Sequence, residues 1–173
     1  MKKLSTYFFI AILTVCILGC ENDNSTPGTK VEMYLLEAYA TTNNTCQIDD
    51  TTVITKKAPL ILYADLLTYD PVEYTFELSI NAINAIDGLQ HSVNGLAFAI
   101  TVDNTIIYTG YFWPAYSSAS CNWVVIDPLM INMGNKIMVT LGYPGPVQGQ
   151  AIPDKRNDNR IISIFESDHK LIQ

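Results

Sequence analysis

Residues 74–80 alternate strictly between apolar and polar side chains, and this pattern constrains the fold more than any other feature of the sequence. Successive side chains on a β-strand point to opposite faces of the sheet, so the alternation predicts a strand with one buried face and one solvated face. The buried face is expected to hold Tyr74, Phe76, Leu78 and Ile80, and the solvated face Thr75, Glu77 and Ser79. Such a strand is typical of an antiparallel sheet.

Further apolar segments, separated by turn signals, predict the other strands. They are expected at residues 31–40, 95–102, 105–113, 123–126 and 137–141. The dipeptide Asp103-Asn104 is expected to form a two-residue hairpin turn, because both residue types tolerate a positive φ. Residues 69–71 are interpreted as a further turn, and residues 41–57 as a long loop.

Two short helices are expected beside these strands. One is capped by Ser79 or Asn81 and ends near Gly88, and the other is capped by Asp158. Their apolar stripes are Ile80, Ile83, Ile86 and Leu89 in the first and Ile161, Ile162, Ile164 and Phe165 in the second. This order of elements predicts an α+β fold, a mainly antiparallel sheet with two short helices packed on it.

Length and charge limit the domain count and the kinds of partner. The chain has 173 residues, with 10 Lys and Arg against 17 Asp and Glu and a net charge of −7. This length corresponds to one globular domain, which we expect to span residues 31–173. An acidic chain without a basic cluster binds phosphate backbones poorly, so no nucleic-acid partner is expected.

The first twenty residues are organised like an export signal. Two lysines precede an uncharged apolar stretch at residues 4–18, which is short for a membrane-spanning helix. The stretch ends in Ile17-Leu18-Gly19-Cys20, which resembles the lipobox of bacterial lipoprotein signals. The resemblance implies that residues 1–19 are removed as a signal peptide and that the Cys20 thiol is acylated. An uncleaved N-terminal anchor and a signal peptide cut elsewhere are the alternatives.

Residues 20–30 are expected to form a lipid anchor and a flexible tether. Residues 21–29 (ENDNSTPGT) are polar and contain Pro and Gly without apolar periodicity. Removal of residues 1–19 takes away two lysines and leaves a net charge of 8 − 17 = −9. The acidic start of the tether resembles the surface-export signal of some Gram-negative lipoproteins. We therefore expect the protein in the cell envelope, bound to the membrane through its lipid, at the outer membrane or the cell surface.

Cys16 lies in the predicted signal peptide and is lost with it, and Cys20 is expected to carry the lipid, so two of the four cysteines remain and favour a disulfide. Cys46 and Cys121 form an even pair in a chain expected to be exported to an oxidising compartment. Two unrelated buried thiols are the alternative. His91 and His169 lie in separate loop-like stretches without the spacing of zinc ligands, and both are expected at the surface. No metal and no cofactor is expected.

Two resemblances cover parts of the chain. Residues 60–113, which include the alternating strand and the segment GLAFAITVD at 95–103, resemble the P1 head subdomain of the SecDF translocation accessory proteins. That resemblance implies a fold and no transport role. The segments YTGYFWP, CNW and LGYPG, at residues 108–114, 121–123 and 141–145, resemble an uncharacterised family of small bacterial lipoproteins. This second resemblance implies a recurring domain and no particular chemistry.

Aromatic residues form the densest candidate binding site. The site would consist of Tyr111, Trp113, Tyr116 and Trp123. Exposed Tyr and Trp rings bury a large area at low entropic cost, so they stack on sugar rings or anchor protein interfaces. We hypothesise a surface that binds a glycan or a peptide of an envelope protein. The alternative is that these rings pack against the sheet and the helices in the core.

No catalytic residue is assigned. Ser117, Ser118 and Ser120 lie beside Cys121, but a hydrolase also needs a base and an oxyanion hole, and the sequence has no G-x-S-x-G elbow. Residues 154–160 (DKRNDNR) are interpreted as a polar loop that caps the last helix. The expected function is a non-enzymatic binding or interaction module. An envelope hydrolase that uses carboxylates or a loop serine, and a structural subunit of an envelope complex, are the alternatives.

Overall fold

Eight strands form one sheet in the computed structural model, which describes residues 29–42, 45–146 and 149–173. The order across the sheet is β2-β1-β5-β6-β7-β8-β4-β3, and all neighbours pair antiparallel except β6 and β7. The strands are β1 (Val31–Ala38), β2 (Ile54–Thr55), β3 (Leu66–Asp70), β4 (Thr75–Leu78), β5 (Leu96–Val102), β6 (Thr105–Phe112), β7 (Cys121–Ile126) and β8 (Lys136–Tyr143). The predicted signal peptide and the lipidation of Cys20 lie outside the described residues.

Two α-helices and three short 3₁₀ helices complete the described part of the chain. They are α1 (Ile80–Asp87), α2 (Asn159–Ser167), η1 (Asp50–Thr52), η2 (Tyr63–Asp65) and η3 (Pro128–Met133). The Ser79 side chain accepts a hydrogen bond from the Ala82 amide, and the Asp158 side chain accepts one from the Arg160 amide, so both α-helices have the caps that the sequence predicts. Within the described ranges, no helix has both the length and the apolar character needed to cross a bilayer. The predicted α+β fold is confirmed.

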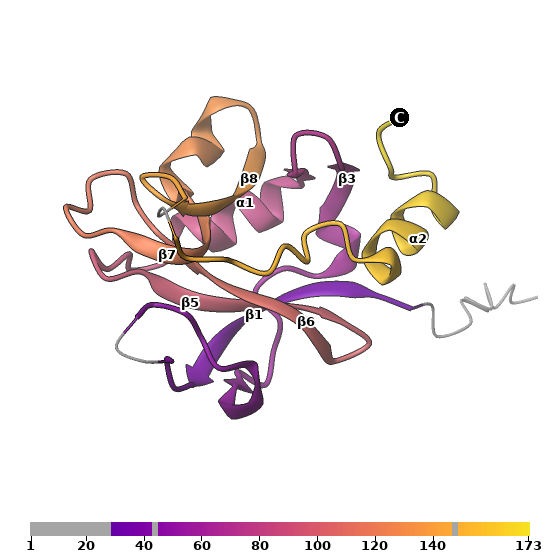
Figure 1. Ribbon diagram of the computed structural model, residues 1–173. Helices are drawn as coiled ribbons and strands as arrows, with labels where there is room; N and C mark the ends of the chain where they lie inside the picture. The colour runs from indigo at the N-terminus through magenta and orange to yellow at the C-terminus, as the bar shows by residue number, and fades with distance from the viewer. Residues whose placement is uncertain (1–28, 43–44, 147–148) are drawn as a thin grey trace, which may run out of the picture.

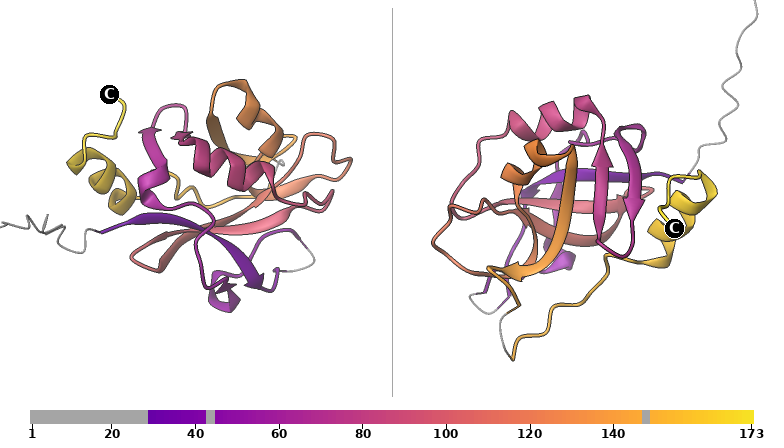
Figure 2. Two further views of the ribbon diagram at one scale, coloured as in Figure 1. Left: turned by 180° about the vertical axis from the view of Figure 1, so that it is seen from behind. Right: turned by 90° about the horizontal axis from the view of Figure 1, so that it is seen from above.

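The main core lies inside the curve of the sheet. In Figure 1, α1, β3 and β8 lie above β1, β5 and β6, and Figure 2 shows α2 beside β3. Strands β4, β5 and β6 and helix α2 place fully buried rings in this core, namely Phe76, Phe98, Phe112 and Phe165. Both α-helices bury an apolar side there, so packing on the sheet stabilises helices too short to persist alone.

A second apolar cluster covers the opposite face of the central strands. On this face Ala97 of β5 pairs with Tyr111 of β6, and the cluster also contains Ile48 from the long loop. The predicted disulfide between Cys46 and Cys121 attaches this loop to β7, with Cα atoms 5.7 Å apart and a sequence separation of 75 residues. Strands β5 and β6 are therefore buried on both faces.

The alternating strand is shorter than the sequence predicts. Strand β4 ends at Leu78, and because Ser79 caps α1, Ile80 becomes the first helical residue. Ile80 is 66% exposed, so its predicted place on the buried face of the strand and on the buried stripe of the helix was wrong. Conversely, Thr75 was expected on a solvated face, but it is buried between Asp70 and Met138, its partners on β3 and β8.

Local turn chemistry explains the best-predicted part of the sheet. Asp103 and Asn104 have φ values of 48° and 64°, as a tight hairpin between β5 and β6 requires. Strand β3 was not predicted, because residues 69–71 were interpreted only as a turn. Its Tyr69 pairs with Phe76 of β4, and the two rings stack with centroids 4.4 Å apart.

Gly110 of β6 leaves room for the Phe98 ring of β5 and for the backbone of β7. A Cβ atom at this position would lie 2.6 Å from the Phe98 ring and 2.8 Å from the carbonyl oxygen of Val124. The Phe98 ring is fully buried and the carbonyl belongs to the backbone, so neither can move aside at low cost.

We therefore expect Gly110→Ala to lower the free energy of unfolding by about 1–3 kcal/mol, as overpacking of a core does. Urea denaturation of the full chain measures this change. Gly145→Ala is the matched control, since no atom lies within 4 Å of the position that its methyl group would take, and its effect should stay within about 0.5 kcal/mol. Equal stability of the two variants would contradict the close contact at Gly110.

Candidate functional site

The aromatic residues do not form the exposed binding surface that was hypothesised. Tyr111, Trp113 and Trp123 are only 3%, 4% and 8% exposed, whereas Tyr116 is 57% exposed and is not a member of their cluster. The three buried rings belong to the second apolar cluster, where Tyr111 and Trp113 meet edge to face with centroids 5.9 Å apart. Because both faces of β6 and β7 are covered, these rings are core residues, which is the alternative that the sequence left open.

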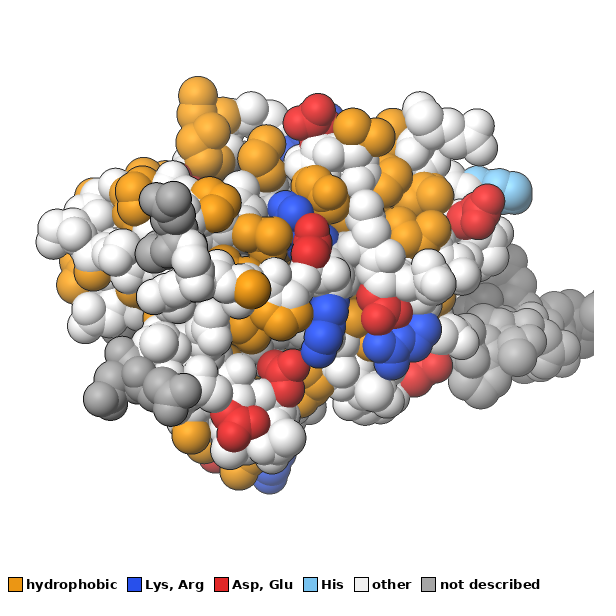
Figure 3. Space-filling view, in the orientation of Figure 1, with side chains coloured by type: hydrophobic (Ala, Val, Ile, Leu, Met, Phe, Trp, Pro, Cys, Tyr) orange, Lys and Arg blue, Asp and Glu red, His pale blue; other side chains and the backbone are white. Residues whose placement is uncertain are grey.

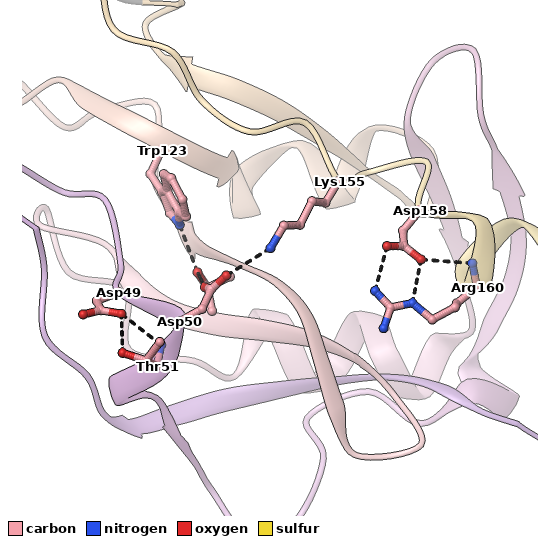
Figure 4. A network of polar contacts seen from close by, with 8 residues as sticks. Asp49, Asp50, Thr51, Trp123, Lys155, Asp158 and Arg160 are labelled. Atoms are coloured by element: carbon pink, nitrogen blue, oxygen red, sulfur yellow. Dashed lines mark hydrogen bonds and ion pairs between the residues drawn. The ribbon is translucent and has the colours of Figure 1, made fainter.

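A chain of polar contacts joins this cluster to the surface (Figure 4). The indole of Trp123 donates to the Thr109 hydroxyl at 3.0 Å, and this hydroxyl donates to Asp50 at 2.9 Å. Lys155 closes the chain with an ion pair to Asp50 at 3.2 Å. The contacts satisfy two buried polar groups and hold η1 and the loop before α2 against β6, so their role is structural.

Ser117, one of the candidate nucleophiles, also has a structural partner. Its hydroxyl donates to the carbonyl oxygen of Val93 at 2.6 Å, and its side chain is buried. A nucleophilic serine would instead direct its proton to a base. The hydrogen bond fixes the loop between β6 and β7 to the segment that precedes β5.

The predicted polar loop at residues 154–160 contains an unpredicted buried cation. Arg156 is 9% exposed, binds both carboxylate oxygens of Asp154 at 2.9 and 2.7 Å, and donates to the Val139 carbonyl at 2.9 Å. Its guanidinium lies 3.5 Å from the centroid of the Tyr74 ring. These contacts engage all three nitrogens of the guanidinium, so Arg156 anchors the loop to β8.

Three methionines line a cleft on the outer side of β8. Met130 and Met133 come from η3 and Met138 from β8, and the cavity they line has a volume of about 360 Å³. Their side chains are 48%, 76% and 48% exposed. We call this cavity the methionine cleft. In Figure 3, apolar side chains are exposed in the upper part of the molecule, where Figure 1 places η3, whereas acidic and basic groups alternate nearer α2.

The register of three strands builds the floor of the methionine cleft. Asp70 of β3 pairs with Thr75 of β4, and Thr75 pairs with Met138 of β8, so these side chains form a row across the outer face. The adjacent row, Tyr69, Phe76 and Ile137, points inward to the main core. The floor is therefore fixed by the same pairing that builds the core.

Helix η3 forms the wall of the methionine cleft and is held at both ends. Asp127 caps it by accepting a hydrogen bond from the Leu129 amide at 3.1 Å, and Gly134 ends it with a φ of 136°. Ile131 is fully buried and fixes how the helix is rotated. Side chains three residues apart eclipse in a 3₁₀ helix, so Met130 and Met133 project from the same side.

Acidic groups border the methionine cleft. Asp70, Glu73 and Asp127 line it together with one cation, Lys136. The Oδ1 atom of Asp70 accepts hydrogen bonds from the amides of Val72 and Glu73 at 2.9 and 3.0 Å, which holds this carboxylate in place. Three carboxylates against one ammonium give the cleft a negative field that favours a cation.

A second, larger cavity lies along α2 but offers less to a ligand. It has a volume of about 700 Å³ and is lined in part by Thr29, Asp103 and Arg160. Arg160 donates to both oxygens of Asp158 at 2.8 Å, and these hydrogen bonds lower the pKa of Asp158 to about 2 (Figure 4). Its strongest charges are already paired, so the methionine cleft is the better candidate site.

Sequence reasoning did not single out the methionine cleft. Three of the five methionines lie within residues 130–138, a local concentration that the sequence displays. Methionine at helix or strand spacing usually marks a core residue, and exposure depends on tertiary packing. The concentration of methionines at residues 130–138 is the sequence feature that could have pointed to the cleft.

Burial predicts the outcome of an aromatic substitution. Trp113→Ala empties a core position and should lower the free energy of unfolding by about 3–5 kcal/mol. Tyr116→Ala removes an exposed ring and should change it by no more than about 0.5 kcal/mol. Chemical denaturation of the full chain followed by circular dichroism distinguishes the two, and a small effect of Trp113→Ala would contradict its place in the core.

Comparisons with family models, with curated proteins and with solved structures find no match to this chain. The resemblances to small bacterial lipoproteins and to the SecDF head subdomain therefore stay predictions.

Proposed function

We propose that this chain is a lipid-anchored protein of the cell envelope whose globular domain binds a cationic ligand in the methionine cleft without catalysing a reaction. The observation that carries the proposal is the set of three partly exposed methionines inside an acidic border. The cleft replaces the aromatic surface as the expected place of binding.

Two features support an envelope location. The sequence Ile17-Leu18-Gly19-Cys20 resembles a lipobox, and the Cys46–Cys121 disulfide is of a kind that forms and persists in oxidising compartments. Together they favour an exported protein that is held to the membrane by acyl chains on Cys20. Two or more acyl chains anchor a protein stably without a membrane-spanning helix.

Three features support ligand binding at the methionine cleft. Its volume of about 360 Å³ lies in the range of small-ligand sites. Exposed apolar side chains at Met130, Met133 and Met138 favour contact with a partner, because contact removes apolar surface from water. Methionine is flexible and polarisable, so it adapts its shape to what it binds.

The anchor is tested by the mass of the protein extracted from membranes of a bacterial host. We expect the full-length gene product to have lost residues 1–19 and to carry acyl chains on Cys20. The Cys20→Ser variant should keep its leader and lack the acyl mass. A wild-type protein with residues 1–19 attached and a free thiol at position 20 would overturn the anchor.

Ligand binding is tested by the thermal stability of the membrane-extracted protein in the presence of metal ions, polyamines and basic apolar peptides. A ligand at about 100 times its Kd adds about 2.7 kcal/mol to the stability of the state that binds it. We expect at least one probe to raise the Tm of the wild type, to be recovered unchanged, and to have no effect on Met133→Lys, which places an ammonium in the cleft.

The matched control is Leu129→Lys, which introduces the same charge on η3 at an exposed residue that does not line the cleft. It should respond to the probe as the wild type does. Equal responses of Met133→Lys and wild type would place binding elsewhere, and conversion of the probe to a product would favour the hydrolase alternative.

A further inference from the structure

We propose that the methionine cleft is a binding site for a soft monovalent metal ion, Cu(I) or Ag(I), coordinated by the thioether sulfurs of Met130, Met133 and Met138. The inference deepens the proposed function by naming the chemical class of the cation, and it rests on that function.

The first argument is that the three sulfur-bearing side chains share one cavity. Met130 and Met133 project from the same side of η3, and Met138 projects outward from β8 because Ile137 and Val139 point into the core. The cap at Asp127 and the buried Ile131 hold η3 in place, while each methionine keeps three rotatable bonds. A fixed backbone with flexible donors allows the sulfurs to close around one ion.

The second argument is the chemistry of the donors. Thioethers are neutral, soft ligands that select Cu(I), whereas carboxylate, carbonyl and water ligands suit Mg²⁺, Ca²⁺ and Mn²⁺. Ag(I) is a monovalent d¹⁰ ion like Cu(I) and shares its preference for sulfur. Three thioethers in one cavity therefore favour these ions over the harder divalent metals.

The third argument is the charge around the sulfurs. Neutral thioethers do not compensate a positive ion, but Asp70, Glu73 and Asp127 line the same cavity. Lys136 opposes them with one positive charge, which leaves an excess of two carboxylates. This excess compensates a monovalent ion while the sulfurs supply the bonds.

The fourth argument is that the other sulfur atoms of the described residues are not accessible to a metal ion. Cys46 and Cys121 are joined in a disulfide, so neither offers a thiolate. Met33 is fully buried in the main core. Among the residues that the structure describes, the accessible sulfur donors are thus gathered in the methionine cleft.

The test uses the protein extracted from membranes, in which we expect Met1 and Cys16 to be removed with the leader and the Cys20 thiol to be acylated, so that no free thiol competes for the ion. It is labelled with ¹³C at the methionine methyl groups and titrated with Ag(I), which needs no reductant. We expect the resonances of Met130, Met133 and Met138 to shift together and to saturate at one equivalent, while Met33 serves as the internal reference and does not shift. Cu(I) with ascorbate should reproduce the shifts, and Zn²⁺ should not.

The matched variant is Met130→Leu combined with Met133→Leu and Met138→Leu, which keeps an apolar cleft and removes the sulfur atoms. Equilibrium dialysis should show that the variant binds one equivalent of Ag(I) less than the wild type, and each single Leu substitution should weaken binding at least about tenfold. Unchanged circular dichroism and urea denaturation of the variant show that it is folded.

Each other outcome is informative. Absence of methyl shifts with Ag(I), or equal shifts with Zn²⁺, overturns the soft-metal inference. If a polyamine or peptide still stabilises the triple Leu variant but not Met133→Lys, the proposed function holds with an organic cation as ligand. If no probe distinguishes Met133→Lys from the wild type, both proposals fail.

Discussion

Burial of β5 and β6 on both faces is the constraint on which the rest of the fold depends. One face carries Phe98 and Phe112 into the main core, and the other carries Ala97 and Tyr111 into the second cluster. The strands can pack this closely because Gly110 has no side chain where Phe98 and the Val124 carbonyl approach. The loop that covers the second face is joined to β7 by the disulfide, so the central strands are enclosed by one packed core and one tethered segment.

Helix-capping and turn residues correctly predicted the helix starts and the hairpin that they form. The caps at Ser79 and Asp158 and the hairpin at Asp103-Asn104 follow from side-chain and turn chemistry within a few residues, and the structure has all three. The cap also explains the error at Ile80, because the alternation continues past the point where Ser79 turns the chain into a helix. Strand β3 was missed because its pairing with β4 is a property of the sheet and not of its own short sequence.

Packing against other elements of the fold determines whether the candidate site residues are buried or exposed. Aromatic side chains on both faces of a strand are compatible with a core or with a binding surface, and only the loop that carries Ile48 settles that Tyr111, Trp113 and Trp123 are core. The reverse holds for Met130, Met133 and Met138, whose residue type favours burial but whose place on η3 and on the outer face of β8 leaves them partly exposed. The buried Arg156 shows the same limit, since its partner Val139 lies on another element.

The position at which β1 enters the domain has a geometric consequence for access. Thr29, just before β1, lies beside α2, and Figure 1 shows the start of β1 at the right of the domain and η3 at the upper left. Nine residues lie between position 20 and Lys30, so these two positions are at most about 35 Å apart when the chain is fully extended. An attachment to lipid at position 20 would keep the start of β1 within that distance of the headgroups, and because the chain enters beside α2, the anchor itself would leave η3 and its methionines uncovered.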